Sequence, residues 1–210
     1  MQSKIAPGAT RLYALEGRHM RKARKIIVYI ATSVDGYIAR LDGSVDWLDR
    51  PRPPGNYGMN AFLRSIDTIL WGKRTYDQAI VWFKGKHLGF GPKTKNFVFA
   101  HHPPASAPAG VEFVNEPVDA FARRLRAQPG KDIWMMGGGQ IIASFLDAGQ
   151  IDEFRIHVIP VFIGEGIPLL QPRHRWVQLK LQAVKRFPDG VVKLVYNIGK
   201  LPQRLGNRKA

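Results

Sequence analysis

The stretch Asp132-Ile133-Trp134-Met135-Met136-Gly137-Gly138-Gly139-Gln140 passes from a short apolar run directly into three glycines. An apolar run of this length, bounded by polar residues and glycine, is typical of a buried strand. Apolar residues then recur at helical spacing from Ile141 to Leu146, and Gly149 follows as a stop signal. The stretch therefore predicts a strand, a glycine turn and a helix in direct succession.

This turn has two interpretations. Glycines at the carboxyl end of a strand let the backbone approach a ligand closely, and the free N–H groups of the next helix bind an anion such as a pyrophosphate. The candidates for such a site are Gly137, Gly138, Gly139, Gln140 and Ile141. The alternative is a tight turn that needs glycine only for packing. The spacing is not the G-x-G-x-x-G of Rossmann domains.

A second turn of the same kind lies upstream. The apolar run 67–71 ends at Gly72-Lys73-Arg74-Thr75, and residues 73–82 have helical character. Lys73 and Arg74 place positive charge beside the N–H groups of a helix N-terminus, which suits a phosphate. A solvated basic turn is the alternative. Two such turns on neighbouring strands would bind the two ends of one dinucleotide at the carboxyl edge of a sheet.

Strands and helices alternate along most of the chain. The patterns predict strands at 25–31, 67–71, 96–100, 111–114, 132–136 and 153–161, and helices at 57–66, 73–82, after Pro117 and around 141–146. Residues 32–54 are expected to form a long loop. A hairpin is expected from 176–187 and 191–198, with Leu179, Leu181 and Ala183 on one face. The fold class is therefore α/β, with a mostly parallel central sheet flanked by helices and a C-terminal antiparallel hairpin.

The composition excludes several classes of protein. The 210 residues include no cysteine, which excludes a disulfide scaffold, a thiol nucleophile and a cysteine-ligated metal. No His, Asp or Glu spacing suggests a metal site, and His157 alternates with apolar residues as on a strand face or interface. There is no apolar run of about 18 residues and no signal peptide, so the cytoplasm is the expected location.

The net charge of +16 is concentrated at the two ends. Residues 1–25 carry +6 and residues 200–210 carry +4, so ten of the sixteen charges lie there. Residues 1–24 are expected to be a disordered basic extension, 25–199 a single domain and 200–210 a disordered basic tail. A nucleic-acid-binding protein that uses these tails is one alternative for the function.

The loop after the first strand supplies further polar candidates. Ser33, Asp35 and Asp46 are expected to bind a polar substrate, and Trp47 to cover it. Asp35 or Asp46 is the candidate for orienting the substrate or relaying its proton. A plain turn at Asp35-Gly36 is the alternative.

Several segments, in this order, resemble one known family. They are 33–39 (SVDGYIA), Asp46-Trp47, 72–76 (GKRTY), 133–139 (IWMMGGG), 151–154 (IDEF), 159–161 (IPV) and 164–170 (GEGIPLL). Over residues 24–199 the chain resembles the dihydrofolate-reductase-like superfamily. Within it, the chain is similar to the C-terminal reductase domain of riboflavin-pathway bifunctional deaminase–reductases and to the stand-alone relatives of that domain.

The resemblance implies NADPH bound across the carboxyl edge of the sheet. Gly72, Lys73, Arg74 and Thr75 would then hold the adenosine-side phosphates, residues 137–141 the pyrophosphate, and Ala31 and Ile38 the nicotinamide. It also implies a cis peptide bond at Gly137–Gly138. Where relatives place Ser or Thr and Arg for the 2′-phosphate, this chain has Ala100-His101-His102. A histidine pair can bind phosphate, and exposed loop residues are the equally good alternative.

The substrate that the resemblance implies is a pyrimidine. The helix at 57–66 has no Asp or Glu, so it cannot pair with a pteridine as in true dihydrofolate reductases. The expected activity is therefore hydride transfer from NADPH to a C=N or C=O carbon, as in 5-amino-6-(5-phosphoribosylamino)uracil reductase. Arg64, Arg40 or Lys84 would meet the substrate phosphate. A homodimer built on 153–168 is expected. The alternatives are a dihydrofolate-reductase-like activity and a non-catalytic nucleotide-binding protein.

Overall fold

The computed structural model describes residues 23–83, 90 and 93–199. The predicted tails, residues 1–24 and 200–210, lie outside this part of the chain except for residues 23 and 24. The strands are β1 (Ile26–Thr32), β2 (Tyr37–Ala39), β3 (Ile66–Gly72), β4 (Lys95–Phe99), β5 (Val111–Val114), β6 (Asp132–Gly137), β7 (Glu153–Val158), β8 (Ile167–Pro168), β9 (Leu179–Arg186) and β10 (Val192–Ile198). The helices are α1 (Met59–Ser65), α2 (Lys73–Trp82), α3 (Val118–Ala127) and α4 (Gly139–Asp147), with single turns at Asp46–Leu48 and Asn56–Gly58.

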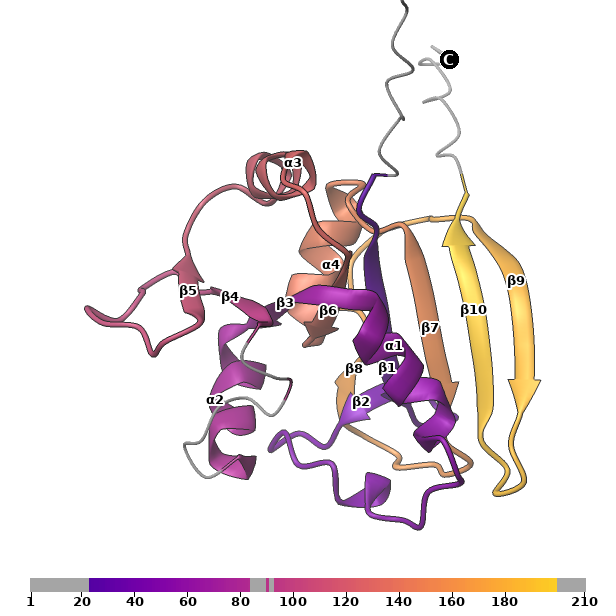
Figure 1. The fold of residues 1–210 in the computed structure, drawn as a ribbon. Coiled ribbons are helices and arrows are strands. Elements are labelled where there is room, and N and C mark those ends of the chain that lie inside the picture. Colours follow the sequence, from indigo (N-terminus) through magenta and orange to yellow (C-terminus); the bar gives the residue numbers. More distant parts are fainter. Residues whose placement is uncertain (1–22, 84–89, 91–92, 200–210) are drawn as a thin grey trace, which may run out of the picture.

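In the described chain the main sheet has the strand order β5-β4-β3-β6-β1-β7-β10-β9 (Figure 1). The pairs from β5 to β7 are all parallel. β10 pairs antiparallel with β7, and β9 pairs antiparallel with β10 at the edge. The predicted fold class, a mostly parallel sheet with a C-terminal antiparallel hairpin, is confirmed. In the same part of the chain, no helix is long and apolar enough to cross a membrane.

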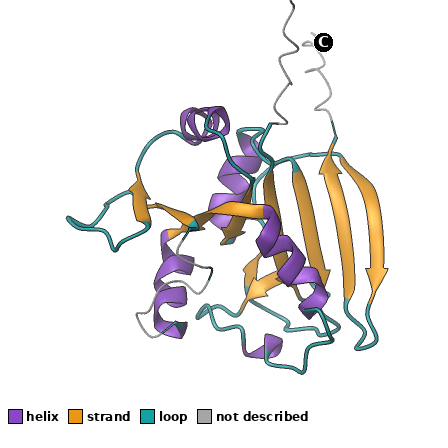
Figure 2. Ribbon diagram, viewed as in Figure 1, coloured by secondary structure: helices purple, strands orange, loops and turns teal. Residues whose placement is uncertain are grey.

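Helices cover both faces of the sheet and create two cores (Figure 2). On one face α3 and α4 bury Phe121, Leu125 and Phe145 against the sheet. On the other face α1 and α2 cover a core rich in aromatic side chains, which includes Tyr29 and Phe62. The central strands are buried on both faces, which explains why their sequences are continuous apolar runs rather than alternating ones.

Two local features differ from the sequence-based expectations. Part of the loop predicted at 32–54 is a strand, since β2 pairs antiparallel with β8 in a small second sheet. Three residues are too few to give a periodic signal in the sequence. In the hairpin, a register shift places Leu181 opposite Tyr196 and Val184 opposite Leu194. The extra residue of this bulge moves Ala183 to the other face.

Arg24 belongs to the packed domain, one residue before the predicted start. Its side chain is 5% exposed and pairs with Asp67. Its Nε donates to the Lys131 carbonyl at 2.6 Å, and its Nη2 donates to the Thr68 hydroxyl at 2.7 Å. A buried guanidinium with this many partners holds β3 against the turn that precedes β6.

Candidate functional site

The two glycine turns lie side by side at one edge of the sheet. β3 and β6 are parallel neighbours, so their carboxyl ends meet at the same edge. A Cβ atom added to Gly72 would lie 3.4 Å from the Gly137 carbonyl oxygen and 3.5 Å from the Gly138 nitrogen. The prediction that the two turns follow neighbouring strands is confirmed.

The glycines of the second turn serve different purposes. At Gly139, the first residue of α4, an added Cβ would lie 2.4 Å from the Pro168 carbonyl oxygen, so the turn needs glycine there for packing. At Gly138 the nearest atom to an added Cβ is the Thr75 Oγ1, at 3.2 Å. The peptide bond between Gly137 and Gly138 is cis, as the resemblance implies. The packing interpretation therefore applies to Gly139, and the ligand-binding interpretation stays a prediction for Gly138.

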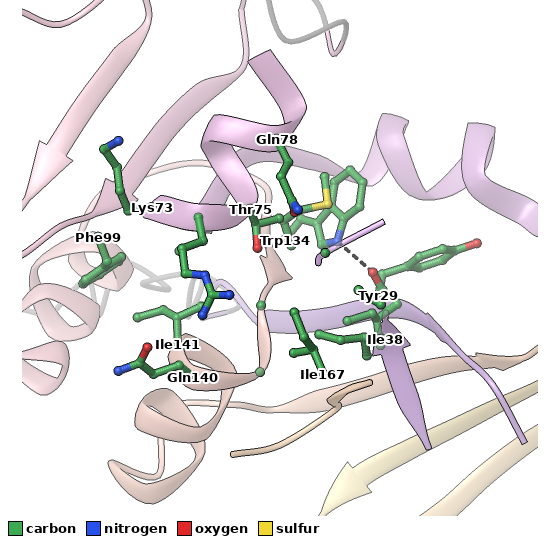
Figure 3. Close-up of a pocket in the computed structure, with 18 of the residues that line it drawn as sticks. Tyr29, Ile38, Lys73, Thr75, Gln78, Phe99, Trp134, Gln140, Ile141 and Ile167 are labelled. Carbon is green, nitrogen blue, oxygen red and sulfur yellow. Dashed lines mark hydrogen bonds between the residues drawn. The ribbon is translucent and has the colours of Figure 1, made fainter. Parts of the chain in front are cut away.

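A cavity of about 1020 Å³ extends from these two turns across the edge of the sheet. Its volume is at the upper end of the usual range for ligand sites, roughly 300–1,000 Å³. Lys73, Phe99 and Gln140 lie at one end, and Tyr29 lies at the other (Figure 3). Twelve of the thirteen predicted cofactor residues line the cavity: Ala31, Ile38, Gly72, Lys73, Arg74, Thr75, Ala100, His101, Gly138, Gly139, Gln140 and Ile141.

The first end of the cavity is formed by the turns after β3, β4 and β5. The Lys73 ammonium lies 2.7 Å from both carboxylate oxygens of Asp77, so its charge is compensated within α2. His101 follows β4, and its carbonyl accepts a hydrogen bond from the Asn115 side chain at 3.0 Å. Among the described lining residues, the one carboxylate is that of Glu116 at this same end. Glu116 is itself paired with Arg124.

Apolar and aromatic side chains enclose the middle of the cavity. Ile38 and Ile167 face Thr75 and Gln78 across the space (Figure 3). Trp134 closes the wall, and its Nε1 donates to the Tyr29 carbonyl at 3.0 Å. This middle section has room for a flat ring between the apolar side chains of Ile38 and Ile167 and the polar side chains of Thr75 and Gln78.

The second end of the cavity combines neutral hydrogen-bonding groups with cations. Burial raises the pKa of Tyr29 to about 12. Burial, and then the charge of Lys193, lower the pKa of His157 to about 4. Both side chains are therefore uncharged at neutral pH. Arg50 and Arg52 line this end and carry positive charge, and the Lys193 ammonium lies 5.0 Å from the centre of the Tyr29 ring.

The predicted acid Asp35 and its neighbour Ser33 lie away from the cavity lining. The Asp35 carboxylate accepts hydrogen bonds from the N–H groups of Ile163 and Gly164, at 3.2 Å and 2.8 Å. The Ser33 hydroxyl, followed by these backbone groups, holds the pKa of Asp35 below its usual range. Asp35 therefore fastens the loop after β7 to the turn between β1 and β2, and nothing places it beside a substrate.

Three further predicted residues also lie outside the lining. Asp46 pairs with Arg40, whose Nε is 2.6 Å from Oδ1. Trp47 follows it in the same short helical turn, and its buried Nε1 has no hydrogen-bond partner within the described residues. Arg64 lies in the last turn of α1, where its carbonyl accepts from Lys131. Of the two other phosphate candidates, Arg40 is bound to Asp46, and Lys84 lies outside the described residues.

The polar residues of the second end were not predicted from the sequence as site residues. Tyr29 and His157 are interior residues of strands, where the sequence offers no sign that they border a cavity. Arg50, Arg52 and Tyr57 come from a non-periodic segment rich in proline and glycine. The one available signal was the pair of arginines in a long loop, since long loops in compact domains are commonly functional.

Comparison with known proteins places this chain in a family. A sequence profile of the RibD C-terminal domain family matches residues 111–193. The chain is 38% identical over 168 residues to the uncharacterised protein YwjB of Bacillus subtilis, a match that covers 80% of this chain and 95% of YwjB. A solved structure from Shewanella sp. PV-4, assigned to riboflavin biosynthesis, has a TM-score of 0.73 at 26% identity and covers 84% of this chain and 99% of that one.

Two more distant structures share the fold. A deaminase/5-amino-6-(5-phosphoribosylamino)uracil reductase of Thermotoga maritima has a TM-score of 0.64 at 17% identity, over 84% of this chain and 57% of that one. A dihydrofolate reductase of Enterococcus faecalis, in complex with NADP(H), has a TM-score of 0.59 at 14% identity, over 84% and 97%. From the matching profile, the Bacillus relative and the dihydrofolate-reductase-like fold, we conclude that the chain belongs to the RibD C-terminal domain family.

Proposed function

We propose that this protein is an NADPH-dependent reductase that transfers a hydride to a C=N or C=O carbon of a phosphorylated, heterocycle-bearing substrate. The observation that carries the proposal is the single cavity shared by the two adjoining glycine turns and the cationic wall at its other end. We expect two ligands to lie end to end in this cavity, one beside the glycine turns and one beside the cationic wall. The reductases of Thermotoga maritima and Enterococcus faecalis, which share the fold, support the reaction class.

The residues present fit a dinucleotide. The first N–H groups of α2 and α4 have no partner within their helices, and both helices begin at the cavity edge. Gly138, Gln140 and Ile141 would hold the pyrophosphate, with Gly72 and Thr75 on the adenosine side. Arg74 would meet the 2′-phosphate, because the charge of Lys73 is already compensated by Asp77. The bound dinucleotide would supply the hydride, and Ala31 and Ile38 would flank its nicotinamide.

The second end of the cavity suits an anionic substrate. Arg50 and Arg52 would attract a phosphate, and Tyr29 and His157 offer neutral hydrogen-bonding groups. A ribosylamino-uracil phosphate has the required phosphate and polar ring. The Shewanella structure assigned to riboflavin biosynthesis favours this substrate class. Arg50 and Arg52 take the phosphate-binding role that the sequence analysis gave to Arg64.

Dihydrofolate fits this end less well. A protonated pteridine needs a buried carboxylate beside it. α1 carries no Asp or Glu, and Glu116, the carboxylate among the described lining residues, lies at the opposite end. A folate reductase activity is therefore the weaker candidate. Nucleic-acid binding would depend on the basic tails, so truncation of residues 1–19 and 201–210 distinguishes it from cofactor binding.

We also propose that the protein is a cytoplasmic homodimer. β7, β10 and β9 share an apolar face, on which Leu194 lies opposite both Ile156 and Val184. Leu181 and Val184 are 50% and 55% exposed there. A second copy of this chain would cover this face. Light scattering should report a dimer, and Leu181→Lys should convert it to a monomer. A monomeric native protein would refute this part of the proposal.

Fluorescence titration with NADPH and NADH tests the proposed function. Saturable NADPH binding should disappear in Gly138→Val, whose side chain would fill the space beside Thr75. Lys73→Ala should weaken it only slightly. Absorbance at the nicotinamide band then reports oxidation of NADPH when the ribosylamino-uracil phosphate is added. Failure of the native protein to bind either cofactor would refute the reductase proposal.

A further inference from the structure

We propose that Asp189, at the tip of the β9–β10 hairpin, is a positioning residue that holds the second end of the cavity in place through Tyr57 and Arg50. Asp189 is not among the residues that line the cavity, whereas Tyr57 and Arg50 are. It therefore acts on a bound substrate only through these two side chains. The expected effect of Asp189 on substrate kinetics, the kinetic part, rests on the proposed function. Its expected effect on the segment 55–58, the structural part, does not.

The contacts of Asp189 join two segments that are about 130 residues apart in the chain. Its carboxylate accepts a hydrogen bond from the Tyr57 hydroxyl. The Arg50 Nη2 donates to the Asp189 carbonyl at 2.8 Å and lies 3.5 Å from Oδ2. In Figure 1 the tip of the β9–β10 hairpin lies at the same end of the molecule as the segment that leads into α1. The hairpin tip and the segment 50–58 are thus connected by a charged hydrogen-bonded group.

The segment that Asp189 holds has an unfavourable backbone conformation. Gly55, Asn56, Tyr57 and Gly58 all have positive φ angles, of 80°, 47°, 54° and 90°. For Asn56 and especially Tyr57, this left-handed conformation costs free energy relative to an ordinary turn. The four residues therefore need contacts with other parts of the fold to keep this shape.

Besides Asp189, Tyr57 contacts Tyr29, Phe187 and His157, and the ring centroids of Tyr57 and His157 are 6.1 Å apart. The Tyr29 hydroxyl donates to the Tyr57 carbonyl at 3.3 Å, a long hydrogen bond. The Tyr57 ring packs edge-to-face against Phe187, with 5.0 Å between ring centroids. None of these contacts involves a charged group. The ionised Asp189 carboxylate therefore makes the strongest of these contacts, because hydrogen bonds to charged groups are about twice as strong as neutral ones.

Asp189 also sets the charge of the wall. The Tyr57 hydroxyl is the main group that holds the pKa of Asp189 below its usual range, so the carboxylate is ionised at neutral pH. Its negative charge partly offsets Arg50, whereas Arg52 has no ion-pair partner within the described residues. Asp189 thus holds Arg50 in place and compensates part of its charge, whereas it does not compensate the charge of Arg52.

Hydrogen exchange tests the structural part without any ligand. The Asn56 amide donates to the Pro53 carbonyl at 3.0 Å, and the Gly58 amide donates to the Gly55 carbonyl at 2.9 Å, so both report opening of the turn. In Asp189→Ala these amides should exchange about 10- to 100-fold faster. Asp119→Asn is the matched control, since it removes an exposed carboxylate paired with Arg123 on α3. Unchanged exchange at residues 55–58 in Asp189→Ala would overturn the proposal.

Tyr57→Phe keeps the ring and removes only the hydroxyl, so it is the second variant if Asp189→Ala does not fold. It should give the same increase in exchange, and the double variant should show no further increase. Additive effects of the two changes would show that the residues act independently and would overturn the proposal.

Kinetics then tests the effect on the substrate. Asp189→Ala should raise the KM for the ribosylamino-uracil phosphate about tenfold or more, with the dissociation constant of NADPH unchanged within twofold. Asp189→Glu, which keeps the charge, should restore part of the loss. An equal loss of NADPH affinity would mean a general structural role and would overturn the kinetic part. Should this substrate not react at all, the proposed function fails, and the exchange result still stands by itself.

Discussion

Replacing Arg74 by glutamine should weaken NADPH binding about tenfold and leave NADH binding almost unchanged. The two cofactors differ only in the 2′-phosphate, and Arg74 is an exposed cation on the cavity wall at the start of α2. A hydrogen bond to a charged group contributes about 1.5–3 kcal/mol, and exposure to water favours the lower value. Since about 1.4 kcal/mol corresponds to a tenfold change in affinity, tenfold is the expected loss.

Lys73→Gln is the matched control for this prediction. The Lys73 ammonium already lies 2.7 Å from both oxygens of Asp77, so less of its charge is available to a ligand. We expect a loss of NADPH affinity below about threefold in this variant. Asp77→Asn should have the opposite effect, because it frees Lys73 and removes a negative charge from the same turn.

Fluorescence titration of both cofactors, at low and at high salt, measures these changes. The preference for NADPH should fall with added salt in the native protein, because exposed charges are screened. Equal losses of NADPH affinity in Arg74→Gln and Lys73→Gln would refute the inference that the ion pair with Asp77 makes Lys73 less available to the cofactor. An equal loss of NADH affinity in Arg74→Gln would show that this side chain does not meet the 2′-phosphate.

Three further predictions concern stability. Gly139→Ala should lower the free energy of unfolding by about 1–3 kcal/mol, because the new methyl group would lie 2.4 Å from the Pro168 carbonyl oxygen. An unchanged Tm would contradict this prediction. The pKa of His157 is about 4 in the folded protein, against an ordinary value of 6.5, so the free energy of unfolding should fall by up to about 3 kcal/mol as the pH drops from 6.5 to 4. Urea unfolding measures this dependence on pH, and His157→Phe should lack it. Arg24→Met should cost about 3 kcal/mol in the same assay, whereas Arg123→Met, which breaks an exposed pair, should cost less than about 1 kcal/mol.

The parts of the fold that the sequence predicted correctly are those set by local chemistry. Helix 73–82 and strand 111–114 have the predicted bounds. Both are bounded by signals in the adjacent residues, such as Gly72 before the helix. The two glycine turns belong to the same class, because a buried strand, a glycine and a helix are each visible within a few residues. The first end of the cavity includes both turns, so most of their residues could be predicted from the sequence as lining residues, whereas Asn115, Glu116 and Pro117, which follow β5, could not.

Arg24 and Asp35 show why other parts could not be predicted. A guanidinium is usually exposed, and Arg24 is buried only because partners near residues 67 and 131 converge on it. Asp35 stands after a strand end, where a catalytic acid is plausible, and yet its carboxylate is occupied by the N–H groups of Ile163 and Gly164. Such partners lie more than 40 residues away in the chain, and no periodic pattern in the sequence predicts these contacts.

The residues of the second end of the cavity were also hard to predict, because they come from distant and partly irregular segments of the chain. Tyr29 and His157 come from strands, Arg50 and Tyr57 from an irregular segment, and Asp189 from a hairpin tip. In the sequence Asp189 is an ordinary turn residue of Pro188-Asp189-Gly190. Its links to the cavity are contacts with Tyr57 and Arg50, which lie more than 130 residues earlier in the chain. The first end of the cavity depends partly on turns that a sequence encodes locally, whereas the second end depends on long-range contacts such as those of Tyr57 and Arg50 with Asp189. If the proposed function is correct, substrate preference should therefore change with fewer substitutions than cofactor binding.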